Sequence, residues 1–317
     1  MQIIRGLHNL RAEHRRCIAT IGNFDGVHLG HQAVFRHLLQ KAGAFGLPAT
    51  VVTFEPQPME FFAPDRAPAR LTRMREKLRA LKEADIDRVV LLEFGRKLSE
   101  MSAEAFVQEL LVDGLDVRYL FIGDDFRFGK GRTGDIELLR RVGREHGFGV
   151  ENMNTFAVGE ERVSSTRIRE ALERGDLQLA AHNLGRPYRI CGRVAHGDER
   201  GRTIGFPTAN IDLHRKVSPL RGVFAVMVSG LDDHLQPGVA NIGTRPTVAG
   251  DTRYLLEVHL FDFDRQIYGE HVEVEFRKKL RDEQKFDSFD ALRQQIARDA
   301  QQARAFLGLS RQDGLAS

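Results

Sequence analysis

The sequence predicts two domains of different class: an α/β domain, followed by an antiparallel β-barrel with a helix at its C-terminal end. Three observations predict this division. The chain has 317 residues, which fits two domains of ordinary size, although a single large domain is not excluded. Short apolar runs alternate with helical patterns up to about residue 182. Beyond that point, strand-like runs separated by turn signals follow one another until a single terminal helix.

In the first half, four short runs rich in β-branched or aromatic residues are predicted to be buried strands, at 16–21, 49–54, 88–94 and 117–122. Apolar residues recur at helical spacing between and after these runs, at 31–45, 73–84, 103–112 and 136–145. Alternation of strands and helices implies right-handed crossovers, so we expect a parallel sheet with helices on both faces.

In the second half, a helix predicted at 177–184 ends at the chain breaker Gly185-Arg186-Pro187. Strands are predicted at 189–194, 223–228, 254–261 and 271–276, and a terminal amphipathic helix at 289–307. Turns are expected at Gly230, Pro237-Gly238 and Asn241-Ile242-Gly243. We therefore predict domains at 1–182 and 183–309, followed by a frayed tail at 310–317.

Composition excludes several classes of protein. The net charge is only +3, and the electrostatic field of so small a charge does not indicate a nucleic-acid partner. No apolar run has the length of a membrane span, and the N-terminus lacks the apolar stretch of a secretory signal. The two cysteines, Cys17 and Cys191, lie far apart without metal-site spacing. We expect a cytoplasmic protein with no membrane or nucleic-acid partner, and the sequence allows a homo-oligomer.

The segment Gly22-Asn23-Phe24-Asp25-Gly26-Val27-His28-Leu29-Gly30-His31 joins the first strand to the first helix and is predicted to bind phosphate. Ligands of open α/β sheets bind beyond the carboxyl ends of the strands, and a helix N-terminus attracts anions. His28 and His31 lie one helical turn apart and could donate N–H groups to phosphate oxygens. Two alternatives stay open here: ordinary surface histidines, or metal ligands with Asp25 as a third ligand.

HLGH at this position resembles the HxGH signature of the nucleotidyltransferase superfamily, and GNFDGVHLGHQ is similar to its flavin-adenylating members. VSSTRIR at 163–169 resembles their second signature; its hydroxyls could cap a helix and Arg169 could neutralise phosphate, although alone it would suit any capped surface helix. TFEPQP at 53–58 and GDDFRFG at 123–129 are similar to the TFxPxP and GxDFxFG segments. In isolation, these two segments would be ordinary turns at strand ends.

The stretch GRVAHGDERGRTIGFPTAN at 192–210 is the most informative in the chain. Its glycines could wrap phosphates, and Thr208 and Asn210, two residues apart on a predicted strand, could share one cation. A glycine-rich loop alone is weak support, but GFPTAN resembles the motif of riboflavin kinases, in which the Thr and Asn bind Mg²⁺ and ATP phosphate. NIGTRPT at 241–247 and EVHLFDF at 257–263 match further motifs of that family in order.

Glu257 interrupts the apolar run YLLEVHLF, where a carboxylate needs a partner or a function. By resemblance it corresponds to the proposed general base of riboflavin kinases. KLRDEQKF at 279–286 resembles the loop that covers the flavin, although alone it would be a solvated charge run. The chain has GVFA at 222–225 where the family often has GVYA; the missing phenol hydroxyl casts little doubt on activity.

Together these motifs are similar to those of the prokaryotic bifunctional riboflavin kinase/FMN adenylyltransferase family, from Gly22 to about Phe306. The resemblance implies a Rossmann-like nucleotidyltransferase domain and a Greek-key barrel with a terminal helix. The barrel would convert riboflavin and ATP to FMN and ADP, and the N-terminal domain would convert FMN and ATP to FAD and pyrophosphate, with Mg²⁺ as cofactor.

Residue roles implied by the resemblance fall into four groups. The catalytic residues would be Glu257, His28, His31 and Arg169. The adenylylation site would bind ATP through Gly22, Asn23, Phe24, Asp25, His28, His31, Asp125, Arg162, Ser165, Thr166 and Arg169, and FMN through Phe54, Pro56 and Phe62. The kinase site would bind ATP through Gly197, Arg202, Gly205, Thr208 and Asn210, with Thr208 and Asn210 also holding the metal. It would bind the flavin through Glu257, Arg281 and Glu283.

Two other hypotheses remain at this point. The chain could be an adenylyl- or cytidylyltransferase for another phosphate substrate, with the barrel as an accessory; Thr208, Asn210 and Glu257 argue against that. It could also be a flavin-binding regulator without turnover, but both sites keep their charged groups.

Overall fold

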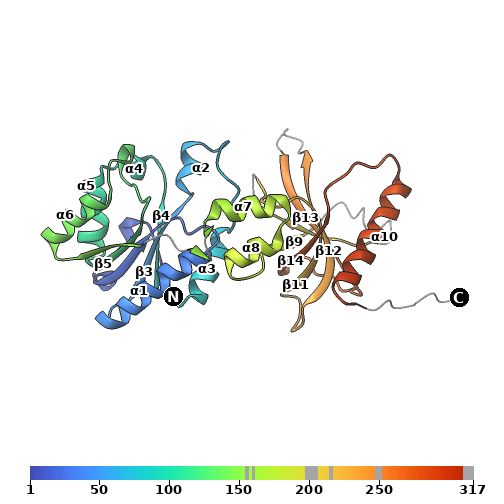
Figure 1. The fold of residues 1–317 in the computed structure, drawn as a ribbon, viewed down its shortest axis with the longest axis horizontal. Coiled ribbons are helices and arrows are strands. Elements are labelled where there is room, and N and C mark those ends of the chain that lie inside the picture. Colours follow the sequence, from blue (N-terminus) through green and yellow to red (C-terminus); the bar gives the residue numbers. More distant parts are fainter. Residues whose placement is uncertain (154–156, 159–160, 197–205, 214–216, 247–251, 310–317) are drawn as a thin grey trace. The chain divides into compact units, whose positions relative to one another are not determined.

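The computed structural model describes residues 1–153, 157–158, 161–196, 206–213, 217–246 and 252–309. The chain forms two compact units: Met1–Pro68 with Thr72–Ser164, and Ala69–Leu71 with Ser165–Ser317 (Figure 1). Helices α7 (Ser165–Arg174) and α8 (Leu177–Leu184) therefore pack with the second unit. The domain boundary expected at residue 182 remains a prediction.

The first unit contains a six-stranded parallel sheet in the order β1-β4-β3-β2-β5-β6. Its strands are β1 (Gln2–Arg5), β2 (Cys17–Ile21), β3 (Ala49–Glu55), β4 (Arg88–Glu93), β5 (Val117–Gly123) and β6 (Gly149–Met153). The parallel sheet and its four expected strands are confirmed. The sequence analysis missed β1 and β6, the two edge strands, because edge strands are only partly buried and carry no continuous apolar run.

Helices cover both faces of this sheet (Figure 1), because alternate residues of each buried strand point to opposite sides. Ile18 of β2 packs in one cluster with Phe35 of α1 (Leu29–Phe45) and Leu81 of α3 (Met74–Glu83). Ala19 packs on the other face, in a cluster with Leu110. That face is covered by α5 (Ala103–Phe106), the π-helix Val107–Gly114 and α6 (Ile136–His146).

The prediction of one α-helix over 103–112 is wrong in part, because only the first turn of this segment is α-helical and the rest is a π-helix. In the π-helical part, the Leu115 N–H donates to the Leu110 carbonyl, five residues back. A Cβ at Gly114 would lie 2.7 Å from the Glu109 carbonyl oxygen, so the bare glycine lets this wide turn close. The short elements of the unit are α2 (Pro58–Phe62), α4 (Arg96–Ser99), β7 (Ala157–Val158), β8 (Glu161–Arg162) and 3₁₀ turns at Leu7–Asn9, Ala12–His14 and Lys130–Arg132.

The second unit contains a closed barrel in the order β10-β13-β12-β11-β14-β9, with every adjacent pair antiparallel. Its strands are β9 (Arg189–Ala195), β10 (Ala209–Asp212), β11 (Gly222–Ser229), β12 (Gln236–Pro246), β13 (Thr252–Leu260) and β14 (His271–Arg281). The terminal helix α10 (Phe289–Phe306) lies beside β11, β12 and β14 (Figure 1). The predicted antiparallel barrel and terminal helix are confirmed.

Two of the expected turns are wrong, because Pro237-Gly238 and Asn241-Ile242-Gly243 both lie inside β12. Glycine serves here for close approach rather than for reversal of the chain. A Cβ at Gly238 would lie 2.6 Å from the His259 carbonyl oxygen on the neighbouring strand. A Cβ at Gly243 would lie 2.1 Å from Glu283 Oε1.

The alternation of buried residues separates the inside of the barrel from the face under α10. Phe224 of β11 and Leu256 of β13 belong to the interior cluster. Val223 belongs to a second cluster with Ala300 and Ala303 of α10. Because Glu257 follows Leu256, it points outward, to the face of the barrel that α10 covers in part.

Candidate active sites

The paired imidazoles lie where β2 gives way to α1. His28 is the N-cap of α1, and the backbone N–H of His31 donates to His28 Nδ1 at 3.4 Å. The two rings stack, with centroids 3.6 Å apart and planes inclined by 19°. Since Nδ1 of His28 accepts this bond, a neutral His28 carries its proton on Nε2 and can donate it to an anion at the helix N-terminus.

His31 is held as a neutral imidazole. Its Nδ1 is buried and has no hydrogen-bond partner among the described residues. Burial lowers the pKa of His31 well below its usual value, and the neighbouring His28 and Lys77 lower that pKa further. The ring of Phe24 packs edge-on against it, with centroids 5.2 Å apart. A buried polar nitrogen of this kind needs a hydrogen-bond partner, which a bound ligand could supply.

Asp25 ties the glycine loop to the start of α3. One of its oxygens, Oδ1, accepts bonds from the backbone N–H of Thr72 at 3.0 Å and from the Thr72 hydroxyl at 3.2 Å. The N–H of Gly26 donates to Thr72 Oγ1 at 2.9 Å. The structure thus adds Thr72 to this site, a residue that the sequence analysis missed because no local motif marks it.

Lys77 is a second residue that the sequence analysis missed. It is 0% exposed, and its Nζ donates to Thr53 Oγ1 at 3.4 Å. A lysine in a charged amphipathic helix is usually solvated, so its type gave no signal. Its position did: Lys77 shares a helix face with Ala80 and Leu81, which are also buried.

An aromatic surface forms at the carboxyl end of β3, the same edge of the sheet as the imidazoles. Phe54 is nearly buried and Phe62 is 62% exposed, and both pack edge-on against Phe94, with centroids 5.9 and 5.5 Å away. Phe61 joins this cluster from α2. The predicted FMN residues Phe54 and Phe62 are thus brought together by Phe94, which the sequence analysis did not single out.

Other residues predicted for adenylylation are not brought to the imidazoles by the described contacts. Asp125 is exposed after β5, and Arg162 lies in β8 with its side chain outside the described residues. Ser165, Thr166 and Arg169 belong to α7 of the second unit, where Arg169 Nε donates to the Ala69 carbonyl at 2.6 Å. Their partnership with His28 and His31 therefore remains a prediction.

A cavity of about 450 Å³ lies between the outer face of the barrel and α10. This volume is typical of small-molecule sites. Four residues predicted for the kinase, namely Thr208, Glu257, Arg281 and Glu283, line it together. The other lining residues are Phe206, Val223, Val239, Ala240, Asn241, His259, Gln284, Phe286, Phe289, Leu292, Ile296 and Asp299.

Strand register sets a row of three polar side chains on one face of the barrel, and two of them, Glu257 and Asn241, line this cavity. Glu257 of β13 is paired with Asn210 of β10 on one side and with Asn241 of β12 on the other. Directly paired residues of antiparallel strands point to the same face. Strand β10 begins at Ala209, so Thr208 precedes the strand and does not lie on it as expected. Gly197, Arg202 and Gly205 lie outside the described residues.

Charge in this cavity is concentrated on three carboxylates, those of Glu257, Glu283 and Asp299, and on the guanidinium of Arg281. Burial raises the pKa of Glu283, and the nearby Glu257 raises it further, against the opposing effects of arginines and of a hydrogen bond from Asn241. Arg281 binds Asp299 of α10 through Nε, at 3.0 Å from each carboxylate oxygen, and through Nη2 at 2.7 Å. The end of β14 is thereby held to the terminal helix.

Asn210 offers the clearest test of whether the kinase site suits a hard cation. Its Oδ1 is buried and finds no hydrogen-bond partner in the described part of the chain. Oxygen ligands of this kind are those that Mg²⁺ prefers. The metal hypothesis for the imidazole pair gains no such support, because the described residues include no cluster of three or more His, Cys, Asp or Glu side chains.

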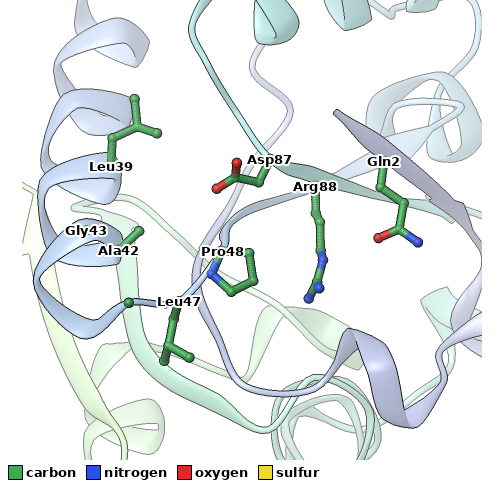
Figure 2. A pocket seen from close by; sticks show the side chains of 9 residues that line it. Gln2, Leu39, Ala42, Gly43, Leu47, Pro48, Asp87 and Arg88 are labelled. Atoms are coloured by element: carbon green, nitrogen blue, oxygen red, sulfur yellow. The ribbon is translucent and has the colours of Figure 1, made fainter.

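A second cavity, of about 550 Å³, lies at the amino-terminal edge of the parallel sheet. Figure 2 shows Leu39 and Ala42 of α1 on one side of it and Gln2 and Arg88 on the other. Its charged groups are used by the fold: Asp87 accepts from the Ala49 N–H at 2.8 Å, and Arg88 donates to the His14 carbonyl at 3.1 Å. Ligands of open α/β sheets bind at the opposite, carboxyl edge, where the imidazoles lie.

Comparison with known proteins decides between the hypotheses. A family model described as FAD synthetase matches residues 10–167, and one described as riboflavin kinase matches residues 184–307. A bifunctional riboflavin kinase/FMN adenylyltransferase of Escherichia coli (strain K12) is 54% identical over 312 residues, covering 98% of this chain and 99% of the relative. The chain belongs to the bifunctional riboflavin kinase/FMN adenylyltransferase family.

A family member of Haemophilus influenzae is 53% identical over 306 residues, covering 96% of this chain and 99% of the relative. A solved structure, described as a macrolide-efflux protein from Streptococcus pneumoniae, matches with a TM-score of 0.81 and 30% identity, over 96% of this chain and 99% of the other. Among the described helices, none has the length and apolar character needed to cross a membrane. The family resemblance of the sequence, and the order of its two parts, are confirmed.

Proposed function

We propose that the chain makes FAD from riboflavin in two ATP-dependent steps, with FMN as the product of the first and the substrate of the second. The observation that carries the proposal is the coincidence of motif and geometry: the part matched as riboflavin kinase holds an apolar cavity with a carboxylate at its wall, and the part matched as FAD synthetase holds paired imidazoles at a helix N-terminus.

In the kinase step, the flavin ring would occupy the apolar part of the cavity, among Phe206, Phe286, Phe289, Leu292 and Ile296. Glu257 would accept the proton of the ribityl 5′-hydroxyl as that oxygen attacks the γ-phosphorus of ATP, and ADP would leave. Arg281 and Glu283 would bind the flavin. The pairing of Glu257 with Asn210 supports this, because it brings the proposed base and the proposed metal and phosphate ligand to the same face of neighbouring strands.

Magnesium would be held by Asn210 and Thr208. When bound, it neutralises charge on the ATP phosphates. The support from this chain is the buried, unpartnered Oδ1 of Asn210 and the place of Thr208 in the cavity wall. Gly197, Arg202 and Gly205 are proposed, by their motif alone, to contact the same phosphates.

In the adenylylation step, a phosphate oxygen of FMN would attack the α-phosphorus of ATP, and pyrophosphate would leave. This reaction needs positioning and charge stabilisation rather than a covalent nucleophile. His28 and His31 would donate N–H groups to the phosphates, and Phe54, Pro56 and Phe62 would bind the flavin. The remaining proposed ATP contacts are Gly22, Asn23, Phe24, Asp25, Asp125, Arg162, Ser165, Thr166 and Arg169.

The cytoplasm is the proposed location, since it supplies ATP and suits Cys17 and Cys191, neither of which forms a disulfide. Homo-oligomerisation stays a prediction from the sequence.

The two activities should be separable by single substitutions. The protein is incubated with riboflavin, ATP and Mg²⁺, and FMN and FAD are separated by chromatography. His28→Ala should abolish FAD formation and leave FMN formation intact. Glu257→Gln, which keeps the shape of the side chain, should lower FMN formation by about 10²–10⁴-fold and leave the adenylylation of added FMN unchanged.

Glu270→Gln is the matched control, because Glu270 is exposed on the same barrel and does not line the cavity. It should behave as the parent protein. Loss of both activities in either His28→Ala or Glu257→Gln, with the fold intact, would contradict two independent sites.

A further inference from the structure

We infer that Lys77 is a positioning residue for adenylyl transfer: its buried ammonium group braces, through Thr53, the loop that leads to His28 and His31. The inference rests on the proposed role of the two imidazoles. It adds a residue that lies outside the motifs named above, and it assigns that residue no contact with the reacting phosphates.

The brace is a chain of two hydrogen bonds that joins three elements. Lys77 Nζ on α3 donates to Thr53 Oγ1 near the end of β3 at 3.4 Å. Thr53 Oγ1 donates to the carbonyl oxygen of Asn23 at 3.3 Å. Asn23 lies in the glycine loop, five residues before His28. Lys77 and Thr53 are both 0% exposed, so water cannot replace these bonds without opening the fold.

A second attachment fixes the start of the same helix. Asp25 and Gly26 of the loop both bind Thr72, which lies just before α3. The Lys77 N–H donates to the Arg73 carbonyl at 2.8 Å, so Lys77 follows this attachment by about one helical turn. The loop is therefore held to α3 at two places: at the start of the helix by Thr72, and one turn further along by Lys77, which acts through Thr53.

The charge of Lys77 also acts on the imidazole of His31. Two titratable groups act on the pKa of His31, namely His28 at the helix start and Lys77 from α3. A third, Asp25, lies in the same loop and accepts hydrogen bonds from Thr72. A buried cation next to an imidazole opposes its protonation, and burial and His28 act in the same direction. His31 stays neutral, and the positive charge that remains at the site favours an anionic substrate.

The test compares three substitutions by their FAD formation from added FMN and by its pH dependence. Lys77→Met removes the charge and the donor with little change in volume. Thr53→Val removes the hydroxyl link and keeps the charge. Lys82→Met is the control, since Lys82 is exposed on the same helix. Riboflavin phosphorylation, measured in the same samples, reports on the integrity of the other unit.

For Lys77→Met we expect at least a tenfold loss of FAD formation at pH 7. We also expect the acid limb of its pH profile to move to higher pH, because the pKa of His31 rises when the neighbouring cation is gone. Thr53→Val should lose severalfold in kcat with an unmoved acid limb. Lys82→Met and the kinase activity of all three variants should stay within twofold of the parent.

The inference is overturned if folded Lys77→Met keeps FAD formation within twofold, or if its acid limb does not move. Should Lys77→Met not fold, Thr53→Val decides alone: unchanged FAD formation overturns the inference, and a selective loss supports it. His28→Ala and His31→Ala are measured in parallel. If these two retain FAD formation, the proposed function of the imidazoles has failed; if they lose it and Lys77→Met does not, only the role of Lys77 has failed.

Discussion

At Gly243 the absence of a side chain makes room for a carboxylate. Glu283 Oε1 occupies the space that a Cβ at this position would need, and a hydrogen bond from Asn241 stabilises its charged form. Asn241 in turn is paired with Glu257 across the strands. Gly243 in β12 therefore leaves free the space that Glu283 occupies.

Gly243→Ala is expected to displace Glu283 without unfolding the barrel, because the far end of a glutamate side chain can move. We expect a three- to tenfold fall in kcat/KM for riboflavin and little change in thermal stability. Gly43→Ala is the control, since a Cβ there meets no atom within 4 Å, and it should stabilise α1 by about 0.5–1 kcal/mol. Steady-state kinetics and thermal melting measure both effects. Unchanged kinetics in Gly243→Ala would show that Glu283 has no part in the kinase.

At the scale of elements, ion pairs join α10 to the barrel in two different settings. The Arg281–Asp299 pair connects the end of β14 to α10, and the Asp299 side chain is only 4% exposed. The Arg304–Asp262 pair also reaches from α10 to the barrel, but the Asp262 side chain is 53% exposed. Buried pairs cost far more to break than exposed ones, because an unpaired buried charge remains.

Asp299→Asn is therefore expected to cost about 3 kcal/mol of unfolding free energy, since Arg281 loses its charged partner in a nearly buried site. Asp262→Asn, the matched control on the same helix contact, should cost under about 1 kcal/mol. Urea denaturation of the two variants measures the difference. Equal costs would mean that the burial of Asp299 does not matter.

At the scale of the whole molecule, each unit has a core of its own. Two clusters cover the two faces of the parallel sheet, and two others fill the barrel and the space under α10. Units with separate cores can open separately. A ligand that binds one unit should then stabilise that unit by mass action and leave the other as it was.

Riboflavin with ADP, a pair that cannot react, should slow amide hydrogen exchange in β11 and β12. It should leave exchange in β3 and β5 unchanged. At a hundredfold excess over the dissociation constant, the expected stabilisation is about 2.7 kcal/mol. Mass spectrometry of peptides from the four strands measures the rates of amide hydrogen exchange with and without the ligands. Equal protection of both sets of strands would contradict separate opening.

Local chemistry in the sequence determined much of this protein. Strand and helix periods gave the parallel sheet, the barrel and the terminal helix, because burial of alternate or helically spaced apolar residues is a local requirement. Motifs also predicted His28, His31 and Glu257 as site residues, because a phosphate site and an isolated carboxylate need particular residue types in short segments. These predictions used residues that lie close together in the chain.

The tertiary structure decided the rest. Thr72, just before α3, and Lys77, on α3, lie more than forty residues from the imidazole loop that they help to hold. Asn241 meets Glu257 through strand register, and Glu283 reaches the same cavity from the segment after β14. The glycines of β12 were expected in turns, but Gly238 lies against the neighbouring strand and Gly243 lies against the Glu283 side chain. Such contacts depend on pairing between distant parts of the chain. The residue type at one position does not predict which distant residue will contact it.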